Sequence, residues 1–570
     1  MSERLVITGG TVVDGTGRPP RTANVTIEGD RIVDVSDERH SADRVIDADG
    51  ALVTPGWVDV HTHYDGQVTW ESSLAPSSWQ GVTTVVTSNC GVGFAPVRPE
   101  HHDLLVELME GVEDIPGQTL REGLPWSWES FPEFLEAVDR LPHDADVAVQ
   151  VPHAPLRVYA MGERGRHHEE RATADEIALM ARLAAEGVRA GAVGFSSSRS
   201  PNHKTAKGEP IACMSAAHEE LIAIAAAVGE VNGYLQMVTP FVDFEHDFGL
   251  IEDMIRVSGR PLSFSLIQQD ERPNAWRANL HRLEELRASG LPLLGQVAAR
   301  PVGLVVGLQC SSHPFARVPA YRALGDLPLP ELLTRLREPA TKDAILAEFS
   351  GTAPGTRPRA YRFDRLFEMA DVPEYAPTYT DSIEFQARSQ RRDPAEMAYE
   401  RLIAGDGQTM FFQPFVNFSE GNDEAVAEML RSDATILGLG DGGAHLGLIT
   451  DSSFPTYLLT YWARDRKQGR LDIAEMVRKS TSAGAAAFGL LDRGVLAPGY
   501  KADVNVIDFE NLTVNKPEVH FDLPAGARRL VQRSQGYLHT FCSGVETFHN
   551  GDPTGATPGG LVRGVQDAPR

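Results

Sequence analysis

Apolar and polar positions alternate in short runs over the first 55 residues, and Gly and Asp turns separate the runs. This is the pattern of half-buried β-strands, and no helical spacing fits there. The predicted strands are Leu5–Thr8, Thr11–Val13, Asn24–Glu28, Arg31–Val35 and Arg44–Ile46. A turn followed by strand-like alternation returns in residues 494–508. We therefore expect the two chain ends to pair into one β-domain.

Between the two ends, apolar strand candidates alternate with helical patterns, which is typical of parallel βαβ units. A capping box at Thr173 and Glu176 opens a predicted helix that runs to about Arg189, and Ala216–Val228 and Leu250–Val257 have helical apolar spacing. The strand candidates are Trp57–Val60, Val82–Thr87, Val147–Val151, Ala192–Ser196, Tyr234–Val238, Leu262–Leu266, Leu293–Val297 and Thr435–Leu439. Eight such strands predict an α/β fold, a closed (β/α)₈ barrel with its active site at the carboxyl ends of the strands.

A segment at about residues 310–407 interrupts this rhythm before the last predicted strand. It holds two predicted helices, Pro330–Arg337 and Ala340–Phe349, and a Pro- and Arg-rich stretch from Pro354 to Arg365. One interpretation is a lid or substrate-specificity subdomain over the catalytic face. The other is an insertion that only decorates the fold or forms an oligomer.

The composition narrows the class of partner. The chain has 570 residues, of which 53 are Lys or Arg and 79 are Asp or Glu, a formal charge of −26. This charge repels nucleic acid and anionic membranes, so we expect a small-molecule substrate and neither of those partners. Four scattered cysteines, the absence of a signal-peptide pattern and the absence of a long apolar run predict a cytoplasmic protein. The oligomeric state stays open, with a homo-oligomer as one option.

The strongest local chemical signal is the pair His61 and His63, which follows the first predicted barrel strand. Residues two apart on a strand point to the same side, so both imidazoles can bind one metal ion. Neutral imidazoles suit Zn²⁺ or another divalent transition metal, with one or two ions in the site. Taken alone, the spacing is also common without a metal, since it supplies only two ligands.

Two further residues follow predicted barrel strands. Asp441 lies in a Gly-rich run after the last strand, where a carboxylate can bind a metal and act as general base and acid toward its water. An ordinary Asp in a turn is the alternative. Cys90 follows the second strand in Ser-Asn-Cys-Gly and is either a thiolate ligand or a small buried side chain.

Several motifs together resemble the D-aminoacylase, or N-acyl-D-amino-acid deacylase, branch of the amidohydrolase superfamily. The likeness covers roughly residues 1–300 and 430–550. The motifs are Pro55-Gly-Trp-Val-Asp-Val-His-Thr-His-Tyr-Asp65, Gly81-Val-Thr-Thr-Val-Val-Thr-Ser-Asn-Cys-Gly91, Pro152-His-Ala-Pro-Leu-Arg157, Gly194-Phe-Ser-Ser-Ser198 and the closing run that ends Pro-Gly-Tyr-Lys-Ala-Asp503.

The resemblance implies a TIM-like barrel beside a small β-sandwich formed by both chain ends. The corresponding boundaries are 1–56 for the first part of the sandwich, 57–489 for the barrel with its insertion, and 490–570 for the second part and tail. It also implies zinc-dependent hydrolysis of an amide or N-acyl C–N bond. Carried over by position, His61, His63, Cys90 and Asp441 are metal ligands, and Asp441 is the catalytic acid and base.

The sequence departs from the family at two points. The family places histidines at the ends of the fifth and sixth strands, whereas Gln236 and the pair Gln268-Gln269 stand in those regions here. The site must then bind metal more weakly, use other ligands, or recruit histidines such as His153, His203 or His445. Equally, His445 can cap the turn after Asp441, and His203 can be solvated.

The second departure concerns the substrate. The family has basic residues after its sixth-strand histidine and eighth-strand aspartate, and this chain lacks both. An acidic substrate is poorly held unless Arg199, Lys204 or Arg300 substitutes. The candidate substrate-binding residues are His153, Arg199, His203 and His445. Alternative functions are a lactonase- or imidase-like hydrolase, because the same attack by water serves esters and imides, and a catalytically silent binding protein on the same fold.

Overall fold

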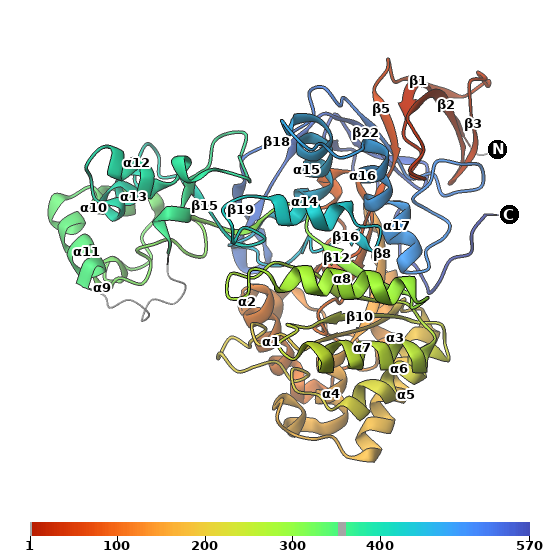
Figure 1. The fold of residues 1–570 in the computed structure, drawn as a ribbon, viewed down its shortest axis with the longest axis horizontal. Coiled ribbons are helices and arrows are strands. Elements are labelled where there is room, and N and C mark those ends of the chain that lie inside the picture. Colours follow the sequence, from red (N-terminus) through yellow and green to blue (C-terminus); the bar gives the residue numbers. More distant parts are fainter. Residues whose placement is uncertain (1–2, 352–360, 570) are drawn as a thin grey trace.

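The structure is a computed structural model that describes residues 3–351 and 361–569. Figure 1 shows a barrel wrapped by helices, a sheet domain near both chain ends, and a helical subdomain that projects from the side. The barrel sheet has eight parallel strands, and the sheet domain is mostly antiparallel. These features confirm the predicted fold class.

The sheet domain joins the two ends of the chain. Its order is β24-β23-β22-β17-β5-β1-β2-β3, with β4 paired to β1. The central contact is antiparallel, between β5 from the first part of the chain and β17 from the last, where Val53 lies opposite Val506. The two predicted strands at residues 5–13 form one strand, β1, with a register shift between Ile7 and Gly10, because the glycines there make an irregularity and not a turn. The bounds are β1 (Arg4–Val12), β2 (Arg21–Glu28), β3 (Arg31–Ser36), β4 (Arg44–Asp47), β5 (Leu52–Pro55), β17 (Val504–Ile507), β22 (Tyr537–Cys542), β23 (Val545–His549) and β24 (Asp552–Pro553).

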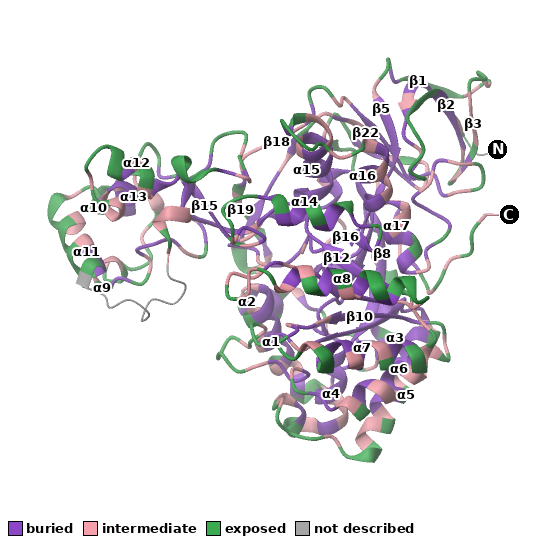
Figure 2. Cartoon of the chain, in the orientation of Figure 1, coloured by how far each residue is buried: buried purple, intermediate pink, exposed green. Residues whose placement is uncertain are grey.

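All eight predicted barrel strands pair in parallel and follow one another in chain order around the sheet. Their backbones run through the buried interior (Figure 2). Helices cover the outside, so both faces of each strand are buried, and the strands read as nearly continuous apolar runs. The bounds are β6 (Trp57–Asp59), β7 (Val82–Thr87), β8 (Asp146–Pro152), β9 (Gly194–Ser198), β10 (Tyr234–Val238), β11 (Leu262–Ser265), β12 (Leu293–Val297) and β16 (Thr435–Leu437).

The seam between the first and last barrel strands is closed just beyond their carboxyl ends. The backbone N–H of Asp441 donates to the carbonyl of His61 at 3.0 Å, and the N–H of His63 donates to the carbonyl of Gly442 at 2.7 Å. The two segments with the strongest chemical motifs are therefore fastened side by side by main-chain hydrogen bonds.

Helices follow most of the barrel strands. Helix α5 begins with the predicted capping box, in which the Thr173 hydroxyl accepts from the Glu176 N–H and the Glu176 carboxylate accepts from the Thr173 N–H. The bounds are α1 (His102–Glu113), α2 (Gly117–Gly123), α3 (Phe131–Asp139), α4 (His153–Met161), α5 (Ala174–Ala190), α6 (His218–Gly229), α7 (Phe244–Ser258), α8 (Ala275–Ala288), α14 (Glu424–Arg431), α15 (Phe454–Tyr457), a π-helix (Leu458–Asp465), α16 (Ile473–Ser480) and α17 (Ser482–Ala487). Within the described ranges, no helix combines the length and apolar character that crossing a bilayer requires.

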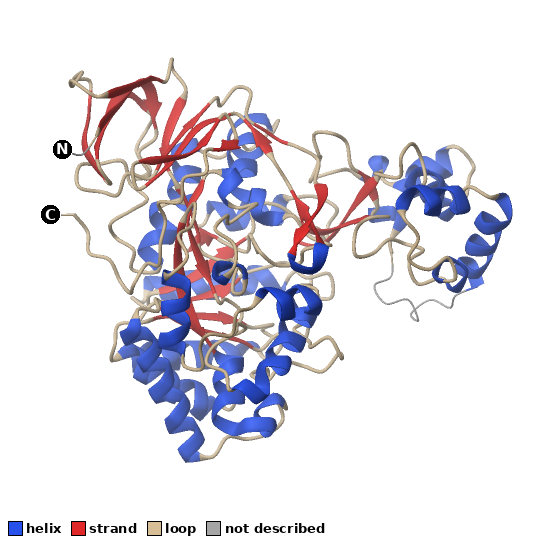
Figure 3. Ribbon diagram, turned by 180° about the vertical axis from the view of Figure 1, so that it is seen from behind, coloured by secondary structure: helices blue, strands red, loops and turns tan. Residues whose placement is uncertain are grey.

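The projecting subdomain is built on a three-stranded sheet in the order β13-β15-β14 (Figure 3). It has a hydrophobic core of its own, which includes Phe315, Leu333, Leu336 and Tyr399. Part of the predicted Pro- and Arg-rich stretch, residues 354–360, lies outside the described residues. The bounds are β13 (Val302–Gly307), α9 (Pro319–Arg322), α10 (Leu329–Leu336), α11 (Pro339–Gly351), β14 (Phe367–Glu368), α12 (Ile383–Ser389), α13 (Pro394–Leu402) and β15 (Met410–Val416).

Candidate metal centre

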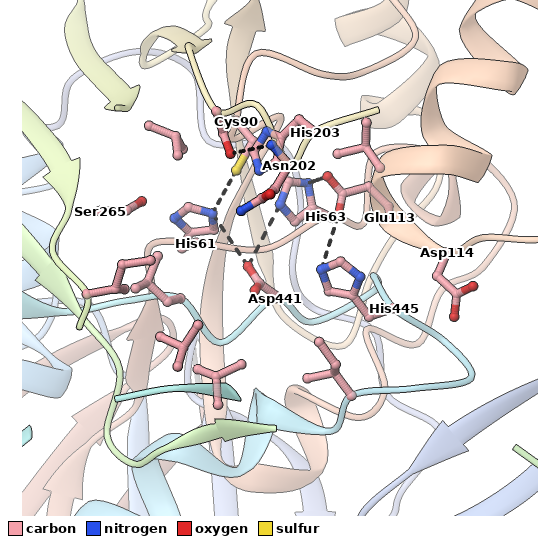
Figure 4. Close-up of a pocket in the computed structure, with 18 of the residues that line it drawn as sticks. His61, His63, Cys90, Glu113, Asp114, Asn202, His203, Ser265, Asp441 and His445 are labelled. Carbon is pink, nitrogen blue, oxygen red and sulfur yellow. Dashed lines mark hydrogen bonds and ion pairs between the residues drawn. The ribbon is translucent and has the colours of Figure 1, made fainter. Parts of the chain in front are cut away.

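Two imidazoles and a thiol converge just beyond the ends of the first two barrel strands. The rings of His61 and His63 have centroids 5.5 Å apart. Cys90 follows β7, and its sulfur lies 3.2 Å from Nε2 of His61. One ligand atom from each of these three buried residues lies within 4.8 Å of the other two (Figure 4). The two loops that were predicted to supply ligands thus meet.

The carboxylate of Asp441 completes the group from the opposite side of the barrel seam. Its Oδ1 lies 3.5 Å from Nε2 of His61 and 3.8 Å from Nε2 of His63. About a fifth of this side chain, 22%, is exposed, whereas the side chains of both histidines are 2% exposed. The four predicted ligand residues therefore lie together, and the Asp441 side chain is more exposed than either imidazole.

Both loops hold non-glycine residues in the left-handed region of backbone conformation. Cys90 has φ 56° and Ser88 has φ 62°, and Asp441 and Leu439 have φ 45° and 59°. Each such residue costs about 1 kcal/mol or more, and backbone strain of this kind clusters at functional sites. The strain coincides here with two of the predicted ligands, which favours a functional role for these turns.

A second layer of side chains orients the imidazoles. The Nδ1–H of His61 donates to Oε1 of Gln296 at 2.6 Å, and Nε2 of Gln296 donates to the Ser263 hydroxyl at 2.8 Å. This arrangement leaves Nε2 of His61 as the lone-pair atom that faces the thiol and the carboxylate. On the other imidazole, Nδ1 of His63 lies 3.4 Å from the buried carboxylate of Glu113 at the end of α1.

Gln296 and Glu113 were not predicted from the sequence. Glu113 sits in a helix with no local motif around it, so only the packing of α1 against the barrel mouth brings it to the site. Gln296 did carry a signal, because it is a polar residue near the end of an otherwise apolar strand, β12. In a barrel, such a residue either faces the interior or disrupts the strand.

The fifth and sixth strands supply no imidazole to this group. The side-chain oxygen of Gln236 on β10 accepts a hydrogen bond from the backbone N–H of Cys90 at 3.2 Å. Beyond β11, Gln268 is bonded to the backbone of Pro273, while Ser265 and Gln269 line the cavity. Gln236 therefore holds the cysteine turn in place.

Three pairs of donor atoms are separated by about the distance between neighbouring ligands of a tetrahedral metal ion. Bonds of about 2.0–2.3 Å place neighbouring tetrahedral donors roughly 3.3–3.6 Å apart. Nε2 of His61 lies 3.2 Å from the sulfur of Cys90 and 3.5 Å from Oδ1 of Asp441, which itself lies 3.8 Å from Nε2 of His63. These three separations bracket that range. Two imidazoles, a thiolate and a carboxylate also form a donor set suited to Zn²⁺. The residues present fit the predicted ion.

Burial determines the direction of the pKa shift for His61, Cys90 and Glu113. It lowers the pKa of His61, which keeps this imidazole neutral and able to donate a lone pair. Burial also raises the pKa of the Cys90 thiol to about 12 and that of the Glu113 carboxyl to about 7. A thiol of that kind ionises when a cation binds beside it, so metal binding and loss of the Cys90 proton are coupled.

The four candidate substrate-binding residues divide into two pairs. His203 and His445 line a cavity of about 330 Å³ at the barrel mouth. Nδ1 of His203 is bonded to the Ser198 hydroxyl at 2.9 Å, and burial lowers the pKa of this imidazole to about 3. His445 reaches toward Glu113, with 3.8 Å between Nε2 and Oε2.

His153 and Arg199 do not line that cavity. The two ring nitrogens of His153 are bonded inside the fold, each at 2.9 Å, to the Ser197 hydroxyl and the Glu220 carboxylate. The guanidinium of Arg199 donates to the carbonyl of Ala216 at 3.1 Å. Both ring nitrogens of His153 and one guanidinium nitrogen of Arg199 are thus bonded within the protein, away from the cavity.

The other two cations considered as carboxylate binders are also placed elsewhere. Arg300 is buried, lies 3.1 Å from Asp451 and stacks at 3.4 Å over the ring of Tyr375. Lys204 is exposed and does not line the cavity.

The cavity has one acidic wall and one apolar wall. Glu113 and Asp114 lie on the side of His445, to the right in Figure 4. The apolar lining residues are Val112, Val238, Pro240, Ile267, Val302, Phe415, Val416, Leu439, Leu448 and Ile449. The strands that flank the insertion, β13 and β15, contribute Val302, Phe415 and Val416 to the lining. No described residue of 310–407 lines the cavity.

The sequence model of the amidohydrolase family matches residues 44–548. Two relatives from Alcaligenes xylosoxydans xylosoxydans are each 27% identical. One is an N-acyl-D-aspartate deacylase, with 99% of this chain and 95% of the relative covered, and the other is a D-aminoacylase, with 88% of each covered. The structure of N-acyl-D-glutamate deacylase from Bordetella bronchiseptica, complexed with zinc and a phosphonate inhibitor, superposes with a TM-score of 0.64. It is 22% identical and covers 99% of this chain and 100% of its own, so the likeness concerns the fold.

Proposed function

Since this chain belongs to the amidohydrolase family and is a hydrolase of carbon–nitrogen bonds other than peptide bonds, we propose that it cleaves an N-acyl bond with the help of a divalent metal ion. The proposed ligands are His61, His63, Cys90 and Asp441, and the proposed ion is zinc. The observation that carries the proposal is the convergence of His61, His63 and Cys90 within 4.8 Å of one another, with the Asp441 carboxylate 3.5 and 3.8 Å from the two imidazoles.

A zinc ion at this position would polarise the acyl carbonyl and lower the pKa of water toward neutrality. The protein supplies the remaining chemistry. Asp441 accepts a proton from the attacking water and returns it to the leaving nitrogen, because its carboxylate faces both the donor group and the cavity. Gln296 orients His61 through a hydrogen bond, and the Glu113 carboxylate lies 3.4 Å from Nδ1 of His63. The apolar wall excludes bulk water from the reacting atoms.

The cavity walls support a preference for uncharged substrates. A substrate carboxylate would face the acidic side chains of Glu113, Asp114 and Asp441. The guanidinium of Arg272, close behind the wall, donates to the carbonyls of Pro240 and Phe241 and to the side chain of Gln269. These hydrogen bonds use the Arg272 guanidinium to position wall residues, so we do not expect it to bind a substrate carboxylate.

We expect the zinc-loaded enzyme to hydrolyse N-acetyl-3-methylbutylamine with a kcat/KM at least about tenfold above that for N-acetyl-D-leucine or its L enantiomer. A contact between like charges costs several kcal/mol. A difference of about 1.4 kcal/mol already corresponds to a factor of ten. The neutral compound differs from the amino acid only by the missing carboxylate. Release of free amine measures the reaction. Preference for either amino acid would contradict the charge argument, whereas failure to hydrolyse N-acyl compounds of either kind would contradict the proposed function.

A further inference from the structure

A second group of possible metal ligands lies outside the barrel, on the hairpin of β22 and β23. His539 and His549 are directly opposite each other in this antiparallel pair. A bulge follows, in which Phe541 pairs with Glu546 while Thr540 pairs with Phe548. Thr547 is thus the extra residue.

The bulge decides which way Glu546 points. Without an extra residue, Glu546 would lie on the opposite face of the sheet from His549, because faces alternate along a strand. The bulge moves it to the face that carries both histidines, in the way that bulges re-aim side chains. Three potential ligands therefore share one face of one hairpin.

Their atoms form a compact triangle. Oε1 of Glu546 lies 2.7 Å from Nδ1 of His539 and 2.8 Å from Nδ1 of His549, and the two nitrogens are 3.3 Å apart. A circle through these three atoms has a radius of roughly 1.7 Å, shorter than zinc–ligand bonds of about 2.0–2.2 Å. An ion can consequently sit at bonding distance from all three, slightly above their plane.

The surroundings support such a site. The side chain of His549 is 54% exposed, which leaves a path for an ion and space for water as a further ligand, whereas those of His539 and Glu546 are mostly covered. Arg44 of β4 pairs with the other carboxylate oxygen of Glu546 and holds Oε1 toward the imidazoles. Its positive charge also weakens cation binding, so this site should fill at higher free zinc than the buried centre.

We propose that His539, Glu546 and His549 form a second site for a divalent transition metal such as Zn²⁺. The ion fastens the C-terminal hairpin, and Arg44 links the same carboxylate to a strand from the opposite end of the chain. Its role is to stabilise the sheet domain, and it takes no part in hydrolysis, since none of the three residues lines the cavity at the barrel mouth.

The test is a zinc count on the full-length enzyme. Wild type, His549→Ala, Glu546→Gln and the control His520→Ala are dialysed against the same series of buffered free Zn²⁺ concentrations. The control removes another partly exposed histidine that is paired with a carboxylate, 3.2 Å from Glu518, but belongs to neither group of three potential ligands among the described residues.

We expect wild type and the control to bind one ion more than His549→Ala and Glu546→Gln, and the rise in Tm on adding zinc to shrink in those two variants. Turnover should be the same in all four proteins. Equal zinc counts in wild type and in both hairpin variants would overturn the proposal. Because Glu546→Gln keeps the shape of the side chain, it decides the outcome if His549→Ala is poorly folded.

Discussion

Replacement of Asp441 by asparagine is expected to lower kcat by about 10³- to 10⁴-fold, the upper range for loss of a general acid and base. The reason is that one carboxylate performs both proton transfers in the proposed reaction. Its Oδ1 lies 3.5 and 3.8 Å from the two imidazoles, and the side chain borders the cavity. The amide of asparagine preserves the shape and removes the basicity.

Zinc content is measured on the same sample, so that loss of turnover is separated from loss of metal. Three of the four proposed ligands remain in the variant, and we expect the ion to be retained. The matched control is Asp114→Asn, because Asp114 also lines the cavity but is not one of the proposed ligands. Its kcat should stay within a few-fold of wild type. An Asp441→Asn enzyme that keeps metal and more than a tenth of its turnover would show that another group carries the proton.

The second large effect concerns stability. Glu220→Ala is expected to destabilise the protein by about 3–5 kcal/mol, because it leaves a buried guanidinium without its counter-charge. Arg157 and Glu220 have side chains 1% and 0% exposed, and Nη1 of Arg157 lies 2.6 Å from both carboxylate oxygens. The same carboxylate holds His153. This network joins α4 to α6 and to β9 through the side chains of Arg157, Glu220 and His153.

The shift in urea midpoint measures this loss. Glu107→Ala is the control, since it removes a carboxylate paired at 2.7 Å with Lys207, whose side chain is 57% exposed, and such a surface pair is worth about 1 kcal/mol or less. Equal shifts for the two variants would mean that the buried network contributes no more than an ordinary surface pair.

The sequence was sufficient for the barrel because each strand carries its own local signal. The run Val82–Thr87 consists only of the β-branched residues valine and threonine, and β7 has those same bounds. The capping box at Thr173 likewise fixes the start of α5 by short-range hydrogen bonds. Strand runs and helix caps of this kind depend on residues close together in the sequence, so they can be predicted from the sequence alone.

The candidate site was only partly predictable for the opposite reason. His61 and His63 are two residues apart, but the partners that orient them, Gln296 and Glu113, come from β12 and α1. The structural role of His153 could not be predicted from the sequence either, because its ring bonds to the carboxylate of Glu220, 67 residues away along the chain. Contacts across the barrel form when distant elements pack together, and no local sequence motif predicts them.

The most direct test of the account is the absorption spectrum of the protein loaded with Co²⁺ in place of zinc. A cobalt ion bound by the Cys90 thiolate gives a near-ultraviolet sulfur-to-metal charge-transfer band, and the hairpin site has no sulfur and contributes none. We predict this band in wild type and its loss in Cys90→Ser, with the other three cysteines unchanged. A cobalt-loaded wild type without the band, or a Cys90→Ser variant that retains it, would contradict the proposed metal centre.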